Sequence, residues 1–155
     1  MAKKHKSPRR QGREKAFQVL YGMHFYSRPD LVHLLRTFDH YIADHRGEMT
    51  PGDAFALELI QGVYEALPEL DRNIAAHCKN WRLERIAKVE LTVLRLSLYE
   101  LIYCEDVPDK VAINEGIELA KKFGDQRSGG FVNGILDAIV HDRTQMTEDR
   151  EPGTG

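Results

Sequence analysis

Residues 83–104 read LERIAKVELTVLRLSLYELIYC and form the most apolar stretch of the chain. The apolar residues recur at helical spacing and cover most of the circumference of a helix. They are Ile86, Val89, Val93, Leu94, Leu96, Leu98, Leu101 and Ile102. A helix that is apolar nearly all round is buried on most of its sides. The stretch therefore predicts a buried central helix, around which the rest of the fold packs.

Apolar stripes at helical spacing predict further helices on both sides of this stretch. Three precede it, at about 11–26, 31–42 and 53–67, and Pro68 indicates a turn into a fourth that reaches Cys78. Two follow it, one at about 108–123 and one after Ser128. Alternating strand-like runs are absent. The pattern predicts an all-α fold, a compact bundle of about seven helices.

Charge is distributed unevenly along the chain, whose net charge is only -2. Residues 1–15 hold seven basic side chains and one acid, a net charge of +6, so the remainder carries -8. A basic segment on an acidic body is typical of a protein that binds a polyanion at one end. A solubilising tail would have the same composition. We expect a flexible basic arm over residues 1–8, one folded domain over 9–142 and a disordered tail over 143–155.

Motifs for catalysis or metal binding are not found. None of the seven histidines forms a His-Glu-x-x-His motif or pairs with a cysteine at zinc-ligand spacing. Cys78 and Cys104 are predicted to be buried free thiols in a reducing compartment. No apolar run is long enough to span a membrane, and no secretory signal opens the chain. We expect a cytoplasmic binding protein without metal or cofactor, not an enzyme.

Four sequence blocks, in order, resemble the NusB family of transcription antitermination factors. The first is RRQGREKAFQVLY at 9–21, and the second is WRLERI at 81–86 followed by LRLSLYEL at 94–101. The third, DVPDKVAINEGIELAK at 106–121, is the most specific, and FVNGILD at 131–137 completes the set. The resemblance runs from about residue 9 to 142, nearly the whole chain.

The resemblance implies a fold of two packed helical subdomains and a function without catalysis. It implies binding to boxA-type RNA in the leaders of ribosomal RNA operons. It also implies a heterodimer with NusE, a small-subunit ribosomal protein, and loading of the pair onto RNA polymerase to suppress termination. A homodimer that masks the basic segment is also expected for some relatives.

The resemblance also implies, position by position, which residues form the binding sites. The RNA-binding residues implied are Lys3, Lys4, Lys6, Arg9, Arg10, Arg13, Arg127 and Phe131. Of these, Lys3, Lys4 and Lys6 are an extra basic stretch, and Arg127 stands where some relatives have an acid. The residues implied to meet NusE are Tyr21, Glu84 and Glu90. Phe131 could instead face the core, and the glutamates could be solvated helix charges.

Two other interpretations fit the same blocks. One is the NusB-like RNA-binding domain found fused to RNA methyltransferases, which would precede a long catalytic domain and which we expect to be disfavoured for a chain that ends at residue 155, unless the chain is a fragment. The other is a helical scaffold that works as a homo-oligomer, with the basic segment serving only solubility. Binding of a boxA-like RNA, strengthened by NusE, would separate these alternatives from an antitermination factor.

Overall fold

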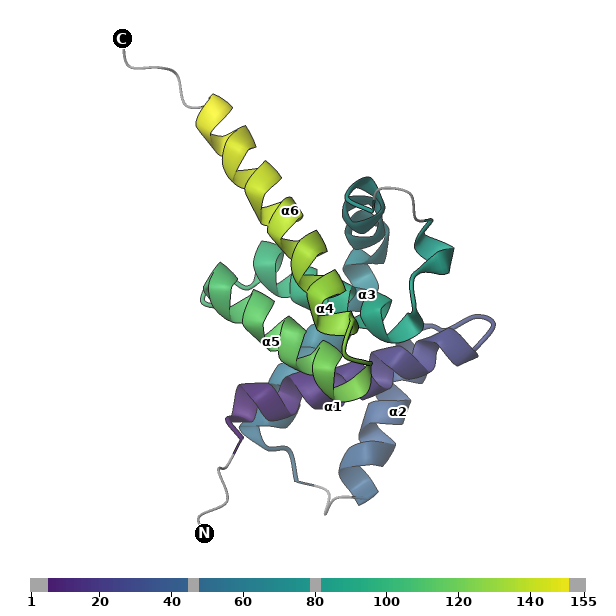
Figure 1. Cartoon of the computed structure of the whole chain (residues 1–155). Coiled ribbons are helices and arrows are strands. Elements are labelled where there is room, and N and C mark those ends of the chain that lie inside the picture. Colours follow the sequence, from purple (N-terminus) through teal and green to yellow (C-terminus); the bar gives the residue numbers. More distant parts are fainter. Residues whose placement is uncertain (1–5, 45–47, 79–81, 151–155) are drawn as a thin grey trace. The chain divides into compact units, whose positions relative to one another are not determined.

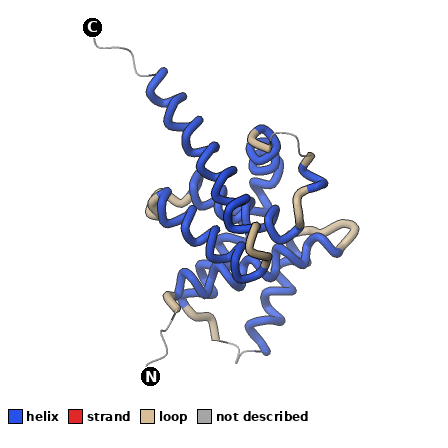
Figure 2. Tube along the Cα trace, in the orientation of Figure 1, coloured by secondary structure: helices blue, strands red, loops and turns tan. Residues whose placement is uncertain are grey.

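Helices make up nearly all of the computed structural model, which describes residues 6–44, 48–78 and 82–150. Within these ranges there are six α-helices, two 3-10 helices and no strand (Figures 1 and 2). The elements are α1 Pro8–Gly22, η1 Met23–Phe25, α2 Leu31–Asp44, α3 Pro51–Ala76, η2 Leu83–Arg85, α4 Lys88–Tyr103, α5 Asp109–Phe123 and α6 Ser128–Arg150. The predicted all-α fold is confirmed.

The chain divides into two helical units, Met1–Leu67 and Pro68–Gly155. In the first unit, α1 packs against η1 and α2. In the second, α4, α5 and α6 pack against one another. A Cβ added at Gly116 of α5 would clash with Ser97 of α4, so the absence of a side chain there allows these two helices to approach closely.

The predicted turn at Pro68 is wrong, because α3 continues through this residue to Ala76. Proline in a helix interior removes one hydrogen bond and costs about 3 kcal/mol or more. The buried stripe of α3 stays in phase across the proline, with Val63 before it and Leu70 and Ile74 after it, all fully buried. Continued burial of this stripe offsets the cost of the proline. The chain therefore has six α-helices in its described part, one fewer than expected.

The predicted central helix begins later than its apolar pattern. Residues 83–85 form the 3-10 helix η2, and α4 starts only at Lys88. The burial of α4 is confirmed, since Val93, Leu94 and Leu98 are fully buried and Leu96 is 1% exposed. Apolar periodicity marks burial accurately, but it does not distinguish an extended entry segment from the first turn of the helix.

The last helix extends into the segment that the sequence predicted to be a disordered tail. Helix α6 runs to Arg150, so residues 143–150 are helical, and residues 151–155 lie outside the described part. The guanidinium of Arg143 donates to the carbonyl of Leu101 at 2.8 Å and to the carboxylate of Asp109 at 2.7 Å. These bonds tie α6 to the end of α4 and the start of α5.

Both cysteines are buried free thiols, as predicted. Burial raises the pKa of the Cys78 thiol above its ordinary value. A raised pKa keeps a thiol protonated and poorly reactive at neutral pH.

We predict that Leu96→Ala lowers the free energy of unfolding by about 2–5 kcal/mol, because it opens a cavity in a fully packed helix. The matched control is Val111→Ala on α5, where the valine is 42% exposed and the loss should stay below about 0.5 kcal/mol. Urea unfolding of the two variants beside the parent is the measurement. Equal stabilities of Leu96→Ala and the parent would show that α4 is not part of the core.

Candidate nucleic-acid interface

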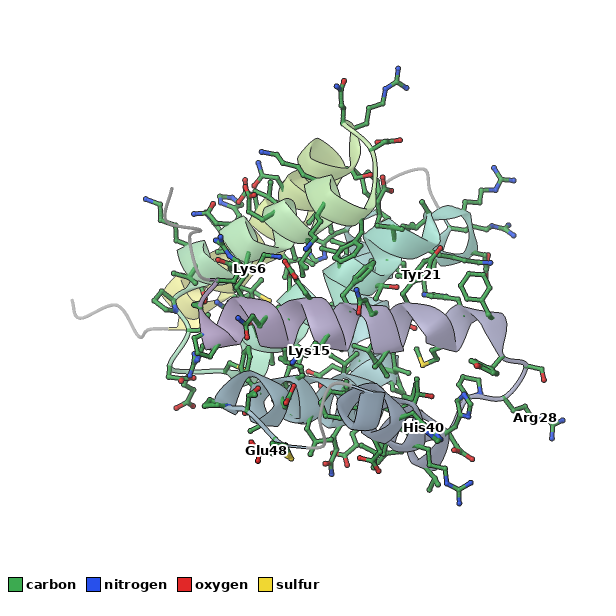
Figure 3. The ribbon with its side chains drawn as sticks, turned by 90° about the horizontal axis from the view of Figure 1, so that it is seen from below. Lys6, Lys15, Tyr21, Arg28, His40 and Glu48 are labelled. Atoms are coloured by element: carbon green, nitrogen blue, oxygen red, sulfur yellow. The ribbon has the colours of Figure 1, made fainter. Side chains whose placement is uncertain are left out.

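The basic segment enters helix α1 through a capped first turn. The Ser7 hydroxyl accepts a hydrogen bond from the backbone N–H of Arg10 at 3.1 Å, and Pro8 occupies the first helical position. Lys6 pairs with Glu14 at 3.0 Å, two turns into the helix. The helix thus begins at the last residue of the predicted flexible arm. Figure 3 labels Lys6 at this end of α1 and Tyr21 near the other end.

Two of the three arginines of α1 lie over one aromatic ring of α3. The guanidinium carbon of Arg9 lies 5.0 Å from the centroid of Phe55, and that of Arg13 lies 5.3 Å from it. Such contacts fix a guanidinium over the ring face. Arg9 and Arg10 are exposed, whereas Arg13 is only 3% exposed. Arg9 and Arg10 therefore present charge to solvent, and Arg13 is held inside the fold.

An ion pair joins the middle of α1 to the start of α3. Lys15 donates to the carboxylate of Asp53, which is 3% exposed and also accepts from the backbone N–H of Thr50 at 2.9 Å. The Thr50 hydroxyl in turn accepts from the backbone N–H of Asp53, as in a capping box. Burial by itself raises the pKa of the Asp53 carboxyl, but the bonds from Lys15 and Thr50 outweigh it and hold the pKa below 3.8, its ordinary value.

Aromatic side chains line the far end of α1. Tyr21 is half-buried, stacks on Phe17 with ring centroids 5.6 Å apart and meets the ring of Phe25 edge-on at 5.3 Å. Phe25 is 61% exposed and Tyr26 is 52% exposed. The family resemblance pointed to Tyr21 but not to its exposed neighbours, because they lie beyond residue 21, where the first matching block ends.

A tight turn in the second unit organises the start of α6. The Asp125 carboxylate accepts from the backbone N–H groups of Arg127 at 2.8 Å and Ser128 at 3.1 Å. The hydrogen bond from the Arg127 backbone is the main cause that holds the pKa of the Asp125 carboxyl below its ordinary value. Arg127 is exposed, and Phe131 is half-buried in the first turn of the helix. An exposed cation and an aromatic ring thus lie one turn apart.

Glu90, at the start of α4, lies against the same turn. Burial raises the pKa of its carboxyl above the ordinary value, a hydrogen bond with the Ser128 side chain acts in the opposite direction, and the nearby charge of Asp125 adds to the rise. The structure thus places Glu90 close to the turn that carries Arg127. Glu84 is instead an exposed residue of η2.

Two of the predicted RNA-binding residues, Lys3 and Lys4, lie outside the described ranges, as does Trp81 of the family resemblance. Among the residues that are described, no group of three or more His, Cys, Asp or Glu side chains could hold a metal ion. In the same residues no helix is long and apolar enough to cross a membrane.

Comparisons with known proteins identify relatives along nearly the whole chain. A model of the NusB family matches residues 10–141. The transcription antitermination protein NusB of Oleidesulfovibrio alaskensis is 51% identical over 141 residues, which cover 90% of this chain and 91% of that protein. The solved structure of T. maritima NusB is 37% identical, with a TM-score of 0.77 over 89% of this chain and 94% of that one.

A second solved structure is a crystal structure of the antitermination factors NusB and NusE in complex with dsRNA. The matched chain is 26% identical to this one, with a TM-score of 0.75. The match covers 87% of this chain and 97% of that chain.

We predict that Asp53→Asn lowers the free energy of unfolding at pH 7 by about 1–3 kcal/mol, because it leaves the partly buried Lys15 ammonium without its counter-charge. The folded-state pKa of Asp53 is depressed, so its contribution is complete above 3.8 and is lost as the pH falls through the folded-state value. The difference between parent and variant should therefore narrow below about pH 4.

Urea unfolding at a series of pH values measures this difference. Asp39→Asn, at an exposed position of α2 in the same unit, is the control and should change stability by less than about 0.5 kcal/mol at every pH. A stability loss for Asp53→Asn that is the same at pH 7 and pH 3.5, or no loss at all, would contradict the role given to the ion pair.

Proposed function

The chain belongs to the NusB family, and we propose that it acts as an RNA-binding transcription antitermination factor. The observation that carries the proposal is the exposed pair Arg9 and Arg10 at the start of α1, in a basic segment that precedes a body with a net charge of -8. The ligand is boxA-type RNA in the leader of a ribosomal RNA operon. NusE is the protein partner, and the complex associates with RNA polymerase to keep transcription processive.

RNA is held first by charge. Arg9 and Arg10 contact phosphates, and Lys6 adds a third cation, because arginine forks match phosphate geometry and lysine acts as a point charge. The capped first turn fixes where these side chains leave the helix. Arg13 supports the site from within by lying over the Phe55 ring beside Arg9. Lys3 and Lys4 extend the same basic segment.

The turn before α6 supplies a second contact. Arg127 binds a phosphate there, and the half-buried ring of Phe131 offers a surface on which an unpaired base stacks. Asp125 holds the turn through backbone hydrogen bonds, so its charge is already engaged by the protein. The Arg127 side chain is exposed at this turn, beside the exposed carboxylate of Asp125.

NusE binds through Tyr21, Glu84 and Glu90. Tyr21 offers a large, half-buried ring next to the exposed Phe25, a composition typical of interface centres. Glu90 supplies a partly desolvated carboxylate and Glu84 an exposed one. The protein is a binding factor of the cytoplasm and catalyses no reaction.

We predict that replacing both Arg9 and Arg10 with alanine weakens binding of a boxA-type RNA and flattens its salt dependence. The slope of the logarithm of the association constant against the logarithm of the salt concentration should become less steep by about 0.7 for each single-strand phosphate that the variant no longer binds. The matched control is the double variant of Arg28 and Arg36, which line a separate hollow after α1. Figure 3 labels Arg28 beyond the end of α1 opposite to Lys6.

Fluorescence anisotropy of a labelled RNA over a salt series measures both slopes. Arg13 stays unchanged in these variants, because truncating a buried side chain would mix folding with binding. An unchanged slope in the Arg9 and Arg10 variant, or an equal loss in the control, would contradict the proposed site.

We predict that Glu90→Lys lowers the affinity for NusE by about tenfold or more. The change puts a cation at a partly desolvated position, where it either repels a cation of NusE or has no partner of opposite charge. Glu118→Lys, at an exposed position of α5, should leave the affinity within about twofold. Titration calorimetry with purified NusE measures both, and circular dichroism checks that helical content is retained. Wild-type affinity in the Glu90 variant would move the NusE interface elsewhere.

A further inference from the structure

A hollow of about 540 Å³ lies beside the basic start of α1. Its walls come from two helix starts of the first unit: Pro8 and Arg9 from α1, and Pro51, Phe55 and Glu58 from α3. The two helix starts approach closely, since a Cβ added at Gly52 would lie 2.7 Å from the carbonyl oxygen of Pro8. This volume is within the range of small-molecule sites and suits one nucleotide.

The walls of the hollow are suited to a flat ring. Two proline rings and the Phe55 ring provide apolar surface. The guanidinium of Arg9 lies over Phe55, 5.0 Å from its centroid, and is exposed. Unstacked RNA bases stack on guanidinium planes that are ordered in this way.

Glu58 is the one acidic side chain that lines this hollow. It is exposed and makes no hydrogen bond or ion pair with the residues that the structure describes. A carboxylate beside a phosphate-binding segment would repel RNA unless it accepted hydrogen bonds from a base. An ionised carboxylate only accepts, and it has two oxygens to do so. A ligand that uses both oxygens presents two adjacent N–H donors.

Guanine is the RNA base that meets this requirement, because its Watson–Crick edge presents N1–H and the N2 amino group side by side. Adenine and cytosine each present an amino donor next to an acceptor nitrogen, and uracil presents one N–H between two carbonyls. Carboxylates accept hydrogen bonds from base amino groups such as cytosine N4, and guanine alone presents a second N–H donor beside its amino group. The charge and the shape of the hollow thus favour one base over the other three.

We propose that this hollow binds one unpaired guanine of the RNA, stacked on Arg9, with the Glu58 carboxylate accepting from N1–H and N2–H. The proposal rests on the proposed RNA-binding function and adds a base-specific subsite to it. Arg10, next to Arg9 and exposed, is placed to hold a flanking phosphate. At this subsite Glu58 of α3 selects the base, while Arg9 and Arg10 at the start of α1 supply affinity.

The test uses fluorescence anisotropy of the full chain with three labelled oligouridines, each carrying one central guanosine, inosine or adenosine. Inosine keeps N1–H and lacks only the N2 amino group. The parent should bind the guanosine RNA about tenfold more tightly than the inosine RNA, the ratio given by about 1.4 kcal/mol of discrimination. Adenosine RNA should bind at least as weakly as inosine RNA.

Glu58→Gln should reduce the guanosine preference to about twofold or less, because an amide offers only one acceptor oxygen. Glu65→Gln is the matched control, since Glu65 is an exposed residue of the same helix that pairs with Gln61; it should keep the full preference. Both changes are at exposed positions, and thermal unfolding checks that each variant folds like the parent.

The outcomes separate the RNA-binding function from the guanine subsite. If the parent binds neither a boxA-type RNA nor the three oligouridines, the function and the subsite are both wrong, and if it binds the boxA-type RNA but none of the oligouridines, only the subsite is wrong. If the parent binds with a salt dependence that Arg9 and Arg10 control but does not distinguish guanosine from inosine, the subsite alone is overturned. A preference that Glu58→Gln leaves intact, or that Glu65→Gln abolishes equally, would overturn it as well.

Discussion

The close approach of α1 to the start of α3 is the constraint on which the candidate RNA site depends. A Cβ added at Gly12 would lie 2.6 Å from the carbonyl oxygen of Gly52, so a side chain there would push the two helices apart. Packing at this distance sets Phe55 beneath Arg9 and Arg13 and brings Lys15 to Asp53. The positions of the exposed cations therefore follow from backbone packing rather than from the charges themselves.

Neighbouring arginines have different roles in this arrangement, one as a buried packing residue and the other as an exposed charge. Arg13 is buried over the ring, whereas Arg9 uses the same ring and stays exposed. A guanidinium that is already ordered loses less conformational entropy when it binds a phosphate or a base. The turn before α6 repeats the principle in the second unit, where Asp125 fixes the backbone and Arg127 remains exposed. In the first unit stacking orders the Arg9 guanidinium itself, whereas in the second unit the hydrogen bonds fix the backbone that carries Arg127.

Much of the fold could be predicted from helical periodicity, because burial of apolar stripes dominates helix stability in this chain. The class of fold, the burial of Leu94 and Leu98 and the family were all predicted correctly. Pro68 misled the prediction because a local rule about proline was outweighed by a buried stripe that continues on both sides of it. The helical extension of α6 depends on Arg143 reaching α4 and α5, which no local pattern reveals.

The site was less predictable, for a physical reason. Sequence separates charged from apolar residues, but it does not say which of two arginines one turn apart is buried. Phe55 lies within the helix predicted at 53–67, and nothing in that segment indicates that its ring lies under Arg9 and Arg13. Glu58 gave no signal at all, since it resembles any exposed helix glutamate until the hollow beside it is seen.

An NMR titration of the isotope-labelled chain with a boxA-type RNA would show directly whether RNA binds at the start of α1 and at the turn before α6. If it does, the side-chain Nε–H signals of Arg9 and Arg10 and the backbone signals around Arg127 and Phe131 shift together as RNA is added, while those of Arg28 and Arg36 stay in place. Shifts confined to the Arg28 and Arg36 region, with the start of α1 unaffected, would contradict the proposed site.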